Sequence, residues 1–361
     1  MRNSLGMFNA AKGVMVVLII LTHSMSDFLA GKPPYAFLSG DIRGLVLLQC
    51  YLSSYAPMPL FFAFCGYGFR HRRQDLLIRN SLVSVLKAYG IVSLSVIGIR
   101  TLTEVLSGGN AVQTLFTECV SYLFALQPET TFRGIFFDSN GPLWFLWTFF
   151  WAVILFNQIL TLNKPRCQTS ACVLLALAGL FLSRYSLPFC LQKILICPSF
   201  LYIGWLMSRE KLLEKRFPWH LAAVTVLYTL ALVFKSGYPL FFSADVYPNG
   251  LPDLIAVWLN VFVLMYPAAH LGTCSGPLAD FLCWTGKNAF LFCCFHTVEL
   301  KALPFRNFIR LTVKSRYLTY MVLFLVSSVW AYGLTYAFER CIKSGRREIR
   351  SQKDTGNGSL R

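Results

Sequence analysis

The sequence contains about ten stretches of roughly 20 predominantly apolar residues, and this repetition constrains the fold more than any single motif. A helix needs about 20 such residues to cross the hydrocarbon core of a bilayer. Apolar residues make up 56% of the chain and charged residues 14%, against roughly 45–50% and 25% in soluble proteins. We therefore expect an all-α fold, a polytopic transmembrane helical bundle. The expected spans lie near residues 11–30, 45–69, 82–106, 142–162, 170–187, 189–207, 219–235, 252–271, 278–300 and 317–339.

The spans fill a single predicted transmembrane domain over residues 1–343, and no soluble domain or internal repeat is apparent. The polar segment 344–361 is predicted to be a disordered tail. Segment 111–127 is apolar but short and interrupted by polar residues, which favours an interfacial or re-entrant position. Segment 301–316 carries five basic residues, and we expect an amphipathic helix at the membrane surface there.

Basic residues orient the bundle, because cytoplasmic loops are enriched in Lys and Arg. Ten spans put both termini on one side. Placing them in the cytoplasm assigns 18 of the 33 basic residues to inner segments, 11 to outer segments and four to spans. The larger number of basic residues in the inner segments, in a chain of net charge +17, favours cytoplasmic termini. The five basic residues of 301–316 then lie outside. Because these charges are spread over loops, they do not indicate nucleic-acid binding.

The cysteines and glycines do not form a recognised site. The 12 cysteines include no CxxC pair and fall mostly in spans, where Cys behaves as a small apolar residue, so we expect no metal site. No phosphate-binding loop, dinucleotide fingerprint or G-x-S-x-G element occurs. We expect no permanently bound cofactor.

Lys12 and His23 are the first candidates for chemistry, because ionisable groups inside spans are costly and usually functional. They are eleven residues apart, which places them on one helix face, about 16 Å apart along the axis. Asp27, one turn later, could fix the tautomer of the imidazole as a general base requires. The alternatives are a lysine that reaches the lipid surface and a histidine that only packs.

Later spans add further candidates. Trp144 could stack on a sugar ring or serve as an interfacial aromatic anchor, and Asn140, with Asp138, could bind hydroxyl groups or form an ordinary turn. His296 and Glu299 share a helix face and could shape a substrate site or complete a proton relay, or else form a solvated helix end. The remaining basic candidates, which could contact an anion or mark an inner surface, are Lys287, Arg70, Arg72 and Arg73.

Several segments, in order along nearly the whole chain, resemble the acyltransferase-3 family of integral membrane O-acyltransferases. Residues 8–24 resemble the N-terminal segment of family members, in which a Lys or Arg is followed, after ten intervening residues, by a His. Residues 55–72 resemble its Met-Pro-Leu-Phe-Phe helix and basic turn, and 141–150 its Pro-Leu-Trp-Phe-Leu element. Residues 284–300 resemble its Gly-Lys-Asn segment with a following His, and 200–211 match more weakly. Lys at position 12 is similar to the fucose 4-O-acetylase-like branch.

The resemblance implies transfer of an acyl group, usually acetyl, from cytoplasmic acyl-CoA to a sugar hydroxyl. His23 would be the general base with Asp27 behind it. Acyl-CoA would contact Lys12 and Lys287 together with Arg70, Arg72 and Arg73, whereas the acceptor sugar would contact Trp144, Asn140, His296 and Glu299. The sequence departs from the family pattern at Asn9, where an acidic residue is usual, and at Cys65 and Ala289, where small polar residues are usual.

The resulting hypothesis is an O-acyltransferase, an acetyl-CoA-dependent O-acetyltransferase, of the bacterial plasma membrane. It would modify a surface glycan or its lipid-linked precursor. A secondary transporter or exporter of glycan intermediates also fits charged residues within spans; the ordered motifs and the lack of a two-half repeat argue against it. The Asn9 departure keeps open a catalytically silent relative that acts as a scaffold.

Overall fold

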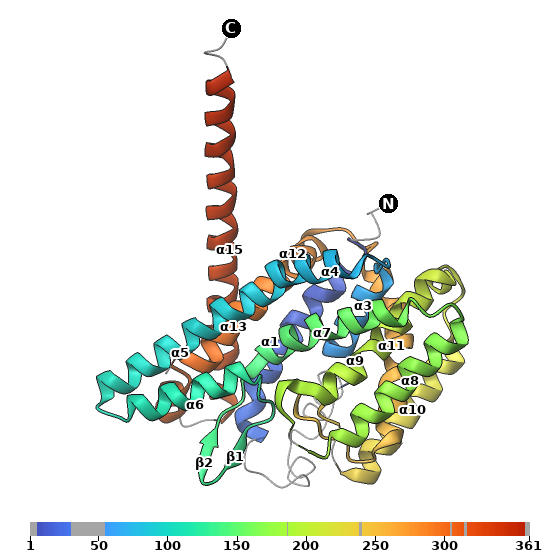
Figure 1. Cartoon of the computed structure of the whole chain (residues 1–361), viewed down its shortest axis with the longest axis horizontal. Helices are drawn as coiled ribbons and strands as arrows, with labels where there is room; N and C mark the ends of the chain where they lie inside the picture. The colour runs from blue at the N-terminus through green and yellow to red at the C-terminus, as the bar shows by residue number, and fades with distance from the viewer. Residues whose placement is uncertain are drawn as a thin grey trace.

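The computed structural model describes residues 6–29, 55–185, 187–237, 240–303, 305–313 and 316–357. Within these ranges, the side chains of 25–29, 316–317 and 345–357 are not described. Over these residues the fold is an all-α bundle, as the sequence predicts, and it also contains a short β-hairpin (Figure 1). The hairpin pairs β1 (Thr130–Phe132) antiparallel with β2 (Ile135–Phe137).

The helices follow the apolar stretches of the sequence. A π-helical turn at Leu82–Leu86 joins α4 to α5. The first helices are α1 (Asn9–Leu29), α3 (Pro57–Tyr67), α4 (Gln74–Ser81), α5 (Lys87–Ser107), α6 (Ala111–Leu123), α7 (Trp144–Ile159) and α8 (Pro165–Leu182). The chain continues through α9 (Leu191–Arg209), α10 (Trp219–Ser236), α11 (Leu251–Leu271), α12 (Pro277–Lys287), α13 (Ala289–Ala302), α14 (Phe305–Thr312) and α15 (Arg316–Asn357).

Seven helical segments in the described ranges are long and apolar enough to cross a membrane. They comprise α4–α5, α7, α8, α9, α10, α11 and the apolar part of α15, and each matches a predicted span. The described parts of the first two predicted spans contain shorter apolar segments, Asn9–Ser24 within α1 and Pro57–Tyr67, which is α3. The chain is therefore a multi-pass membrane protein.

The ninth predicted span, 278–300, is two helices rather than one. Helix α12 ends at Lys287, Asn288 forms a turn, and α13 begins at Ala289. Gly286 and Asn288 are both weak helix formers, and the Asn288 side chain donates to the carbonyl of Trp284 at 3.0 Å, a local bond that competes with helix continuation. The prediction of one continuous helix was wrong at this point.

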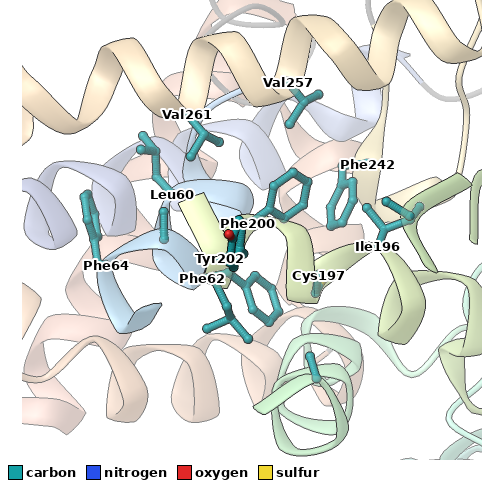
Figure 2. Close-up of a cluster of buried hydrophobic side chains, with 14 of the residues drawn as sticks. Leu60, Phe62, Phe64, Ile196, Cys197, Phe200, Tyr202, Phe242, Val257 and Val261 are labelled. Carbon is teal, nitrogen blue, oxygen red and sulfur yellow. The ribbon is translucent and has the colours of Figure 1, made fainter. Parts of the chain in front are cut away.

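The apolar core lies where α3 and α11 pack against α9. Figure 2 shows side chains from these helices and from the loop before α11 meeting in this cluster. Leu60 and Phe62 of α3 and Phe200 of α9 have no exposed surface. Gly204 of α9 makes this packing possible, because a Cβ atom at Gly204 would clash with the backbone of Ala63. This core holds α7 against α9 and keeps α3 in place beside α1.

Three predicted peripheral segments have defined structures. The 111–127 segment contains α6, which packs beside α5 at one edge of the bundle (Figure 1). The predicted amphipathic helix in 301–316 is α14, which exposes Phe308 and Leu311. For 344–361 the sequence predicts a disordered tail, whereas α15 continues as a helix to Asn357 and projects away from the other helices (Figure 1).

Candidate active site

A cavity of about 330 Å³ lies between α1, α3, α7 and α13, with residues 241–243 closing one side. Most of its lining is apolar, and the polar side chains in it are few. Five residues predicted from the sequence as site residues line this cavity, although they are spread over 285 positions of the chain. They are Lys12, His23, Trp144, Lys287 and His296.

His23 and His296 are in direct contact at one end of the cavity. His23 Nδ1 lies 3.0 Å from His296 Nε2, and the rings are stacked with centroids 5.1 Å apart. On the far side of His296, its Nδ1 lies 2.7 Å from Glu299 Oε2. The Glu299 side chain is completely buried. The three residues thus form a chain of ionisable groups that leads from a buried carboxylate to the cavity.

Arg306 completes this chain and was missed by the sequence analysis. Its Nη1 donates to Glu299 Oε1 at 3.0 Å, and its Nη2 donates to the backbone carbonyl of His23 at 2.8 Å. Ser327 of α15 donates to the same Glu299 oxygen at 2.9 Å. Arg306 was expected at the membrane surface with the rest of α14, but only 6% of it is exposed. Burying an isolated carboxylate is costly, so Glu299, inside a predicted span, needed a cationic partner. That need was the signal in the sequence that could have pointed to Arg306.

Two lysines lie at the opposite end of the cavity from the histidine pair. The helix geometry places Lys12 about 16 Å from His23 along α1. Lys287 lines the same cavity as Lys12. It follows Gly286, where α12 approaches the start of α1 so closely that a Cβ atom would clash with the carbonyl of Asn9. Helix α13 then runs beside α1, so that Phe292 packs near Ile20 and His296 reaches His23.

Other predicted site residues do not line the cavity. Arg70, Arg72 and Arg73 are exposed, and Arg73 pairs with Asp75 at 3.0 Å. They follow the end of α3, where Tyr67 contacts Phe8 just before α1, so they share the end of the molecule that carries Lys12.

Asn140 lies away from the cavity, and the side chain of Asp27 is not among those that the structure describes. Asn140 is completely buried. Its backbone N–H donates to the carbonyl of Leu126 at 2.9 Å, which favours the turn interpretation over sugar contact. Asp27 lies in the last turns of α1, outside the residues whose side chains are described. The expected support for His23 from Asp27 therefore stays a prediction, and His296 is the described partner.

Trp144 is a buried wall of the cavity, with 4% of its surface exposed, so it is not an interfacial anchor. Lys193 Nζ lies 5.4 Å from the centre of its ring. Lys193 is itself completely buried and forms an ion pair with Asp245, which also accepts from Gln192 at 2.7 Å. This ion pair, also missed from the sequence, fastens the loop that contributes residues 241–243 to the cavity.

A second cluster of charges lies just beyond the histidine end of the cavity. Asp138, directly after β2, accepts from Lys301 at 2.7 Å and from Arg100 at 3.0 Å. Arg100 also pairs with the buried carboxylate of Glu118. Burial raises the pKa of the Asp138 carboxyl, but the ion pairs with Lys301 and Arg100 outweigh that effect and hold its pKa below the usual value. Asp138 thus belongs to an ion-pair network and not to an ordinary turn.

Comparisons with known proteins identify the family to which the chain belongs. Searches of curated proteins and of solved structures find no match. A family model described as an acyltransferase domain matches residues 7–340, which include both lysines, both histidines and the helices that carry them. The match covers more than nine-tenths of the chain. On this evidence, the chain belongs to the acyltransferase-3 family and is a membrane acyltransferase.

Proposed function

We propose that this acyltransferase moves an acyl group, most simply acetyl, from cytoplasmic acyl-CoA to a hydroxyl of a sugar, with His23 as the general base. The observation that carries the proposal is that one cavity has two lysines at one end and two histidines at the other. A hydroxyl is a weak nucleophile at neutral pH, so a base must remove its proton as it attacks the thioester. The histidine end supplies that base.

We assign the acting nitrogen of His23 from the surroundings of His296. The Glu299 carboxylate can only accept, so we place the proton of His296 on Nδ1, which lies 2.7 Å from Glu299 Oε2. His296 Nε2 is then an acceptor, and the proton between the two rings belongs to His23 Nδ1. His23 therefore presents the lone pair of Nε2 as the proton acceptor. When Nε2 takes the hydroxyl proton, the Glu299 carboxylate stabilises the resulting imidazolium through His296, as in other carboxylate-supported bases.

The lysine end suits the anionic part of acyl-CoA. Lys12 and Lys287 offer ammonium groups at a cavity mouth, and phosphates bind such groups through charge-assisted hydrogen bonds. The exposed Arg70, Arg72 and Arg73 at the same end of the molecule are proposed to attract the nucleotide portion from outside the cavity. The apolar middle of the cavity, lined by Phe61, Phe145 and Phe149, would enclose the uncharged arm that carries the thioester.

This arrangement fits a membrane with acyl-CoA on one side and the glycan on the other. We place the termini and the lysine end in the cytoplasm, in agreement with the distribution of basic residues. The histidine end then faces the outer half of the membrane, where the acceptor is a surface glycan or its lipid-linked precursor. The cell envelope of a bacterium, with the protein in the plasma membrane, is the setting we propose, and Lys12 favours the fucose 4-O-acetylase-like branch.

The test compares His23→Ala with the wild type in purified full-length protein. Acetyl-CoA and a panel of neutral glycans are supplied, and free CoA and acylated glycan are measured by mass spectrometry, because the protein's own thiols would disturb a colour assay. His220→Ala is the matched control, since His220 is exposed on α10. We expect His23→Ala to lose at least 99% of turnover and His220→Ala to retain it. Full turnover by a folded His23→Ala protein would refute the proposal.

A further inference from the structure

A second cavity, of about 270 Å³, lies beyond the histidine end of the first. Its lining is polar, in contrast to the first cavity, and comes from α5, the residue after β2, the end of α13, and α14. Its size is close to the roughly 300 Å³ at which small-molecule pockets begin, which suits one ring-sized ligand. Its charged side chains are Arg100, Glu104, Asp138, Lys301, Arg306 and Arg310.

The second cavity adjoins the proposed catalytic groups. His296 lines the first cavity and Leu300 lines the second, and these residues are one helical turn apart, about 6 Å along α13. Arg306 lines the second cavity and donates to the carbonyl of His23. The two cavities share no lining residue. The second cavity is thus separate from the first but lies next to it, along α13 and at Arg306.

Hydrogen-bond accounting shows what the second cavity can offer a ligand. Asp138 accepts from Lys301, Arg100 and the N–H of Ser139, so little of its capacity remains. Arg100 uses only Nη1 and Lys301 makes one bond, both to carboxylates. Among the described residues, the other N–H groups of these two side chains have no partner. Glu104, half-buried at the rim, adds a carboxylate acceptor.

The charges around the second cavity balance. Four cations meet four carboxylates, either in the lining or directly behind it. The cations are Arg100, Lys301, Arg306 and Arg310, and the carboxylates are Glu104, Glu118, Asp138 and Glu299. An anion would meet no net attraction here. Groups that both donate and accept, such as the hydroxyls of a sugar, can bond to the remaining N–H groups and to Glu104 at once.

We propose that the second cavity binds an uncharged sugar ring of the acceptor, next to the ring that is acylated. This inference rests on the proposed function, because it assumes that the acceptor is a glycan. Lys301 and Arg100 donate to hydroxyl oxygens of that ring, and Glu104 accepts from a hydroxyl at the rim. The cavity thereby selects acceptors of at least two linked rings and sets which hydroxyl reaches His23.

The test measures binding of methyl glycosides of glucose, galactose, mannose and fucose to the full-length protein in lipid nanodiscs, which avoids detergents with sugar headgroups. Glucuronate and sulfate serve as anionic probes. Lys301→Met keeps the aliphatic stem that packs near Gly141 and leaves Asp138 paired with Arg100. We expect it to weaken binding of the preferred glycoside about ten-fold, as loss of a charge-assisted hydrogen bond does. Glu104→Ala, at the rim, should weaken it several-fold.

Parallel measurements of CoA binding separate this proposal from the function on which it rests. Arg209→Gln is the control, because Arg209 is exposed and pairs with its neighbour Glu210. Both cavity variants should bind CoA as the wild type does. Failure of the wild type to bind any of the four glycosides, equal binding by Lys301→Met, or binding of glucuronate or sulfate alone would overturn the sugar site. Glycoside binding without CoA binding would instead refute the proposed donor.

Discussion

Replacing Glu299 with glutamine tests the relay behind His23 most directly. The change keeps the shape of the side chain but removes the charge that orients His296 and pairs with Arg306. An amide can donate to His296 Nδ1, which would reverse the tautomer and leave His23 Nδ1 without its acceptor. General-base catalysis contributes a rate factor of about 10²–10⁴, and we expect kcat to decrease by a factor in that range.

The same substitution carries a cost in stability that must be separated from the chemistry. It leaves Arg306 buried without its carboxylate, and breaking a buried pair in this way costs about 3–5 kcal/mol. The double variant Glu299→Gln/Arg306→Met removes both charges, and such paired replacements are often neutral for stability. We expect the double variant to recover most of the thermal stability but not the turnover.

Turnover is followed as CoA release by mass spectrometry, and unfolding as loss of helical circular dichroism on heating. Wild-type kcat in a folded Glu299→Gln protein would show that the tautomer reasoning is wrong. Recovery of kcat together with stability in the double variant would assign Glu299 a purely structural role.

Three further outcomes are expected. Lys12→Ala should raise KM for acyl-CoA at least ten-fold with little change in kcat, as loss of uniform binding does; a fall in kcat alone would contradict the phosphate contact. Gly286→Ala should lower the free energy of unfolding by about 1–3 kcal/mol because its Cβ atom meets the Asn9 carbonyl. The control Gly90→Ala, at a helical glycine with open space around it, should be neutral or stabilising. Similar melting temperatures for the two variants would argue against the close approach. Because the pKa of Asp138 is below its usual value in the folded state, its ion pairs stabilise the protein above about pH 4 and lose their effect as the pH falls through that lowered pKa. Asp138→Asn should therefore have a lower melting temperature than the wild type at pH 7, and this difference in melting temperature should disappear on acidification.

The helical spans could be predicted because bilayer thickness fixes their length, and the shared face of Lys12 and His23 followed from helix periodicity. Partners from distant segments could not be predicted in this way. Periodicity says nothing about which helix lies beside another, so the Lys193–Asp245 ion pair was missed, and Arg306 looked like one basic residue among five on a surface helix. With cytoplasmic termini, the basic residues of 301–316 lie on the outer side, against the usual charge distribution. The burial of Arg306 weakens this objection, because Arg306 neutralises Glu299 and is not an exposed outer charge.

Lys12 and Lys287 were chosen because each carried a motif as well as a position inside a span, and both line the first cavity. Their contact with acyl-CoA stays a prediction. Arg70, Arg72 and Arg73 belong to the basic turn of a family-like segment, but a basic loop is expected at any inner membrane surface, so the sequence could not show whether they line the cavity. The break at Asn288 shows a similar limit. Apolar composition continues across that residue, but composition cannot report a side-chain hydrogen bond that ends one helix and begins another.

The contact between His23 and His296 joins residues 273 positions apart, and this separation has a consequence for biosynthesis. At translation rates of about 5–20 residues per second, His23 is made roughly 14–55 s before its partner. Ser327, which binds Glu299, emerges later still, from the final helix. Helix α1 must therefore wait in the bilayer without its His296 partner until the later segments are inserted, so a nascent chain stalled before α15 would lack a complete relay.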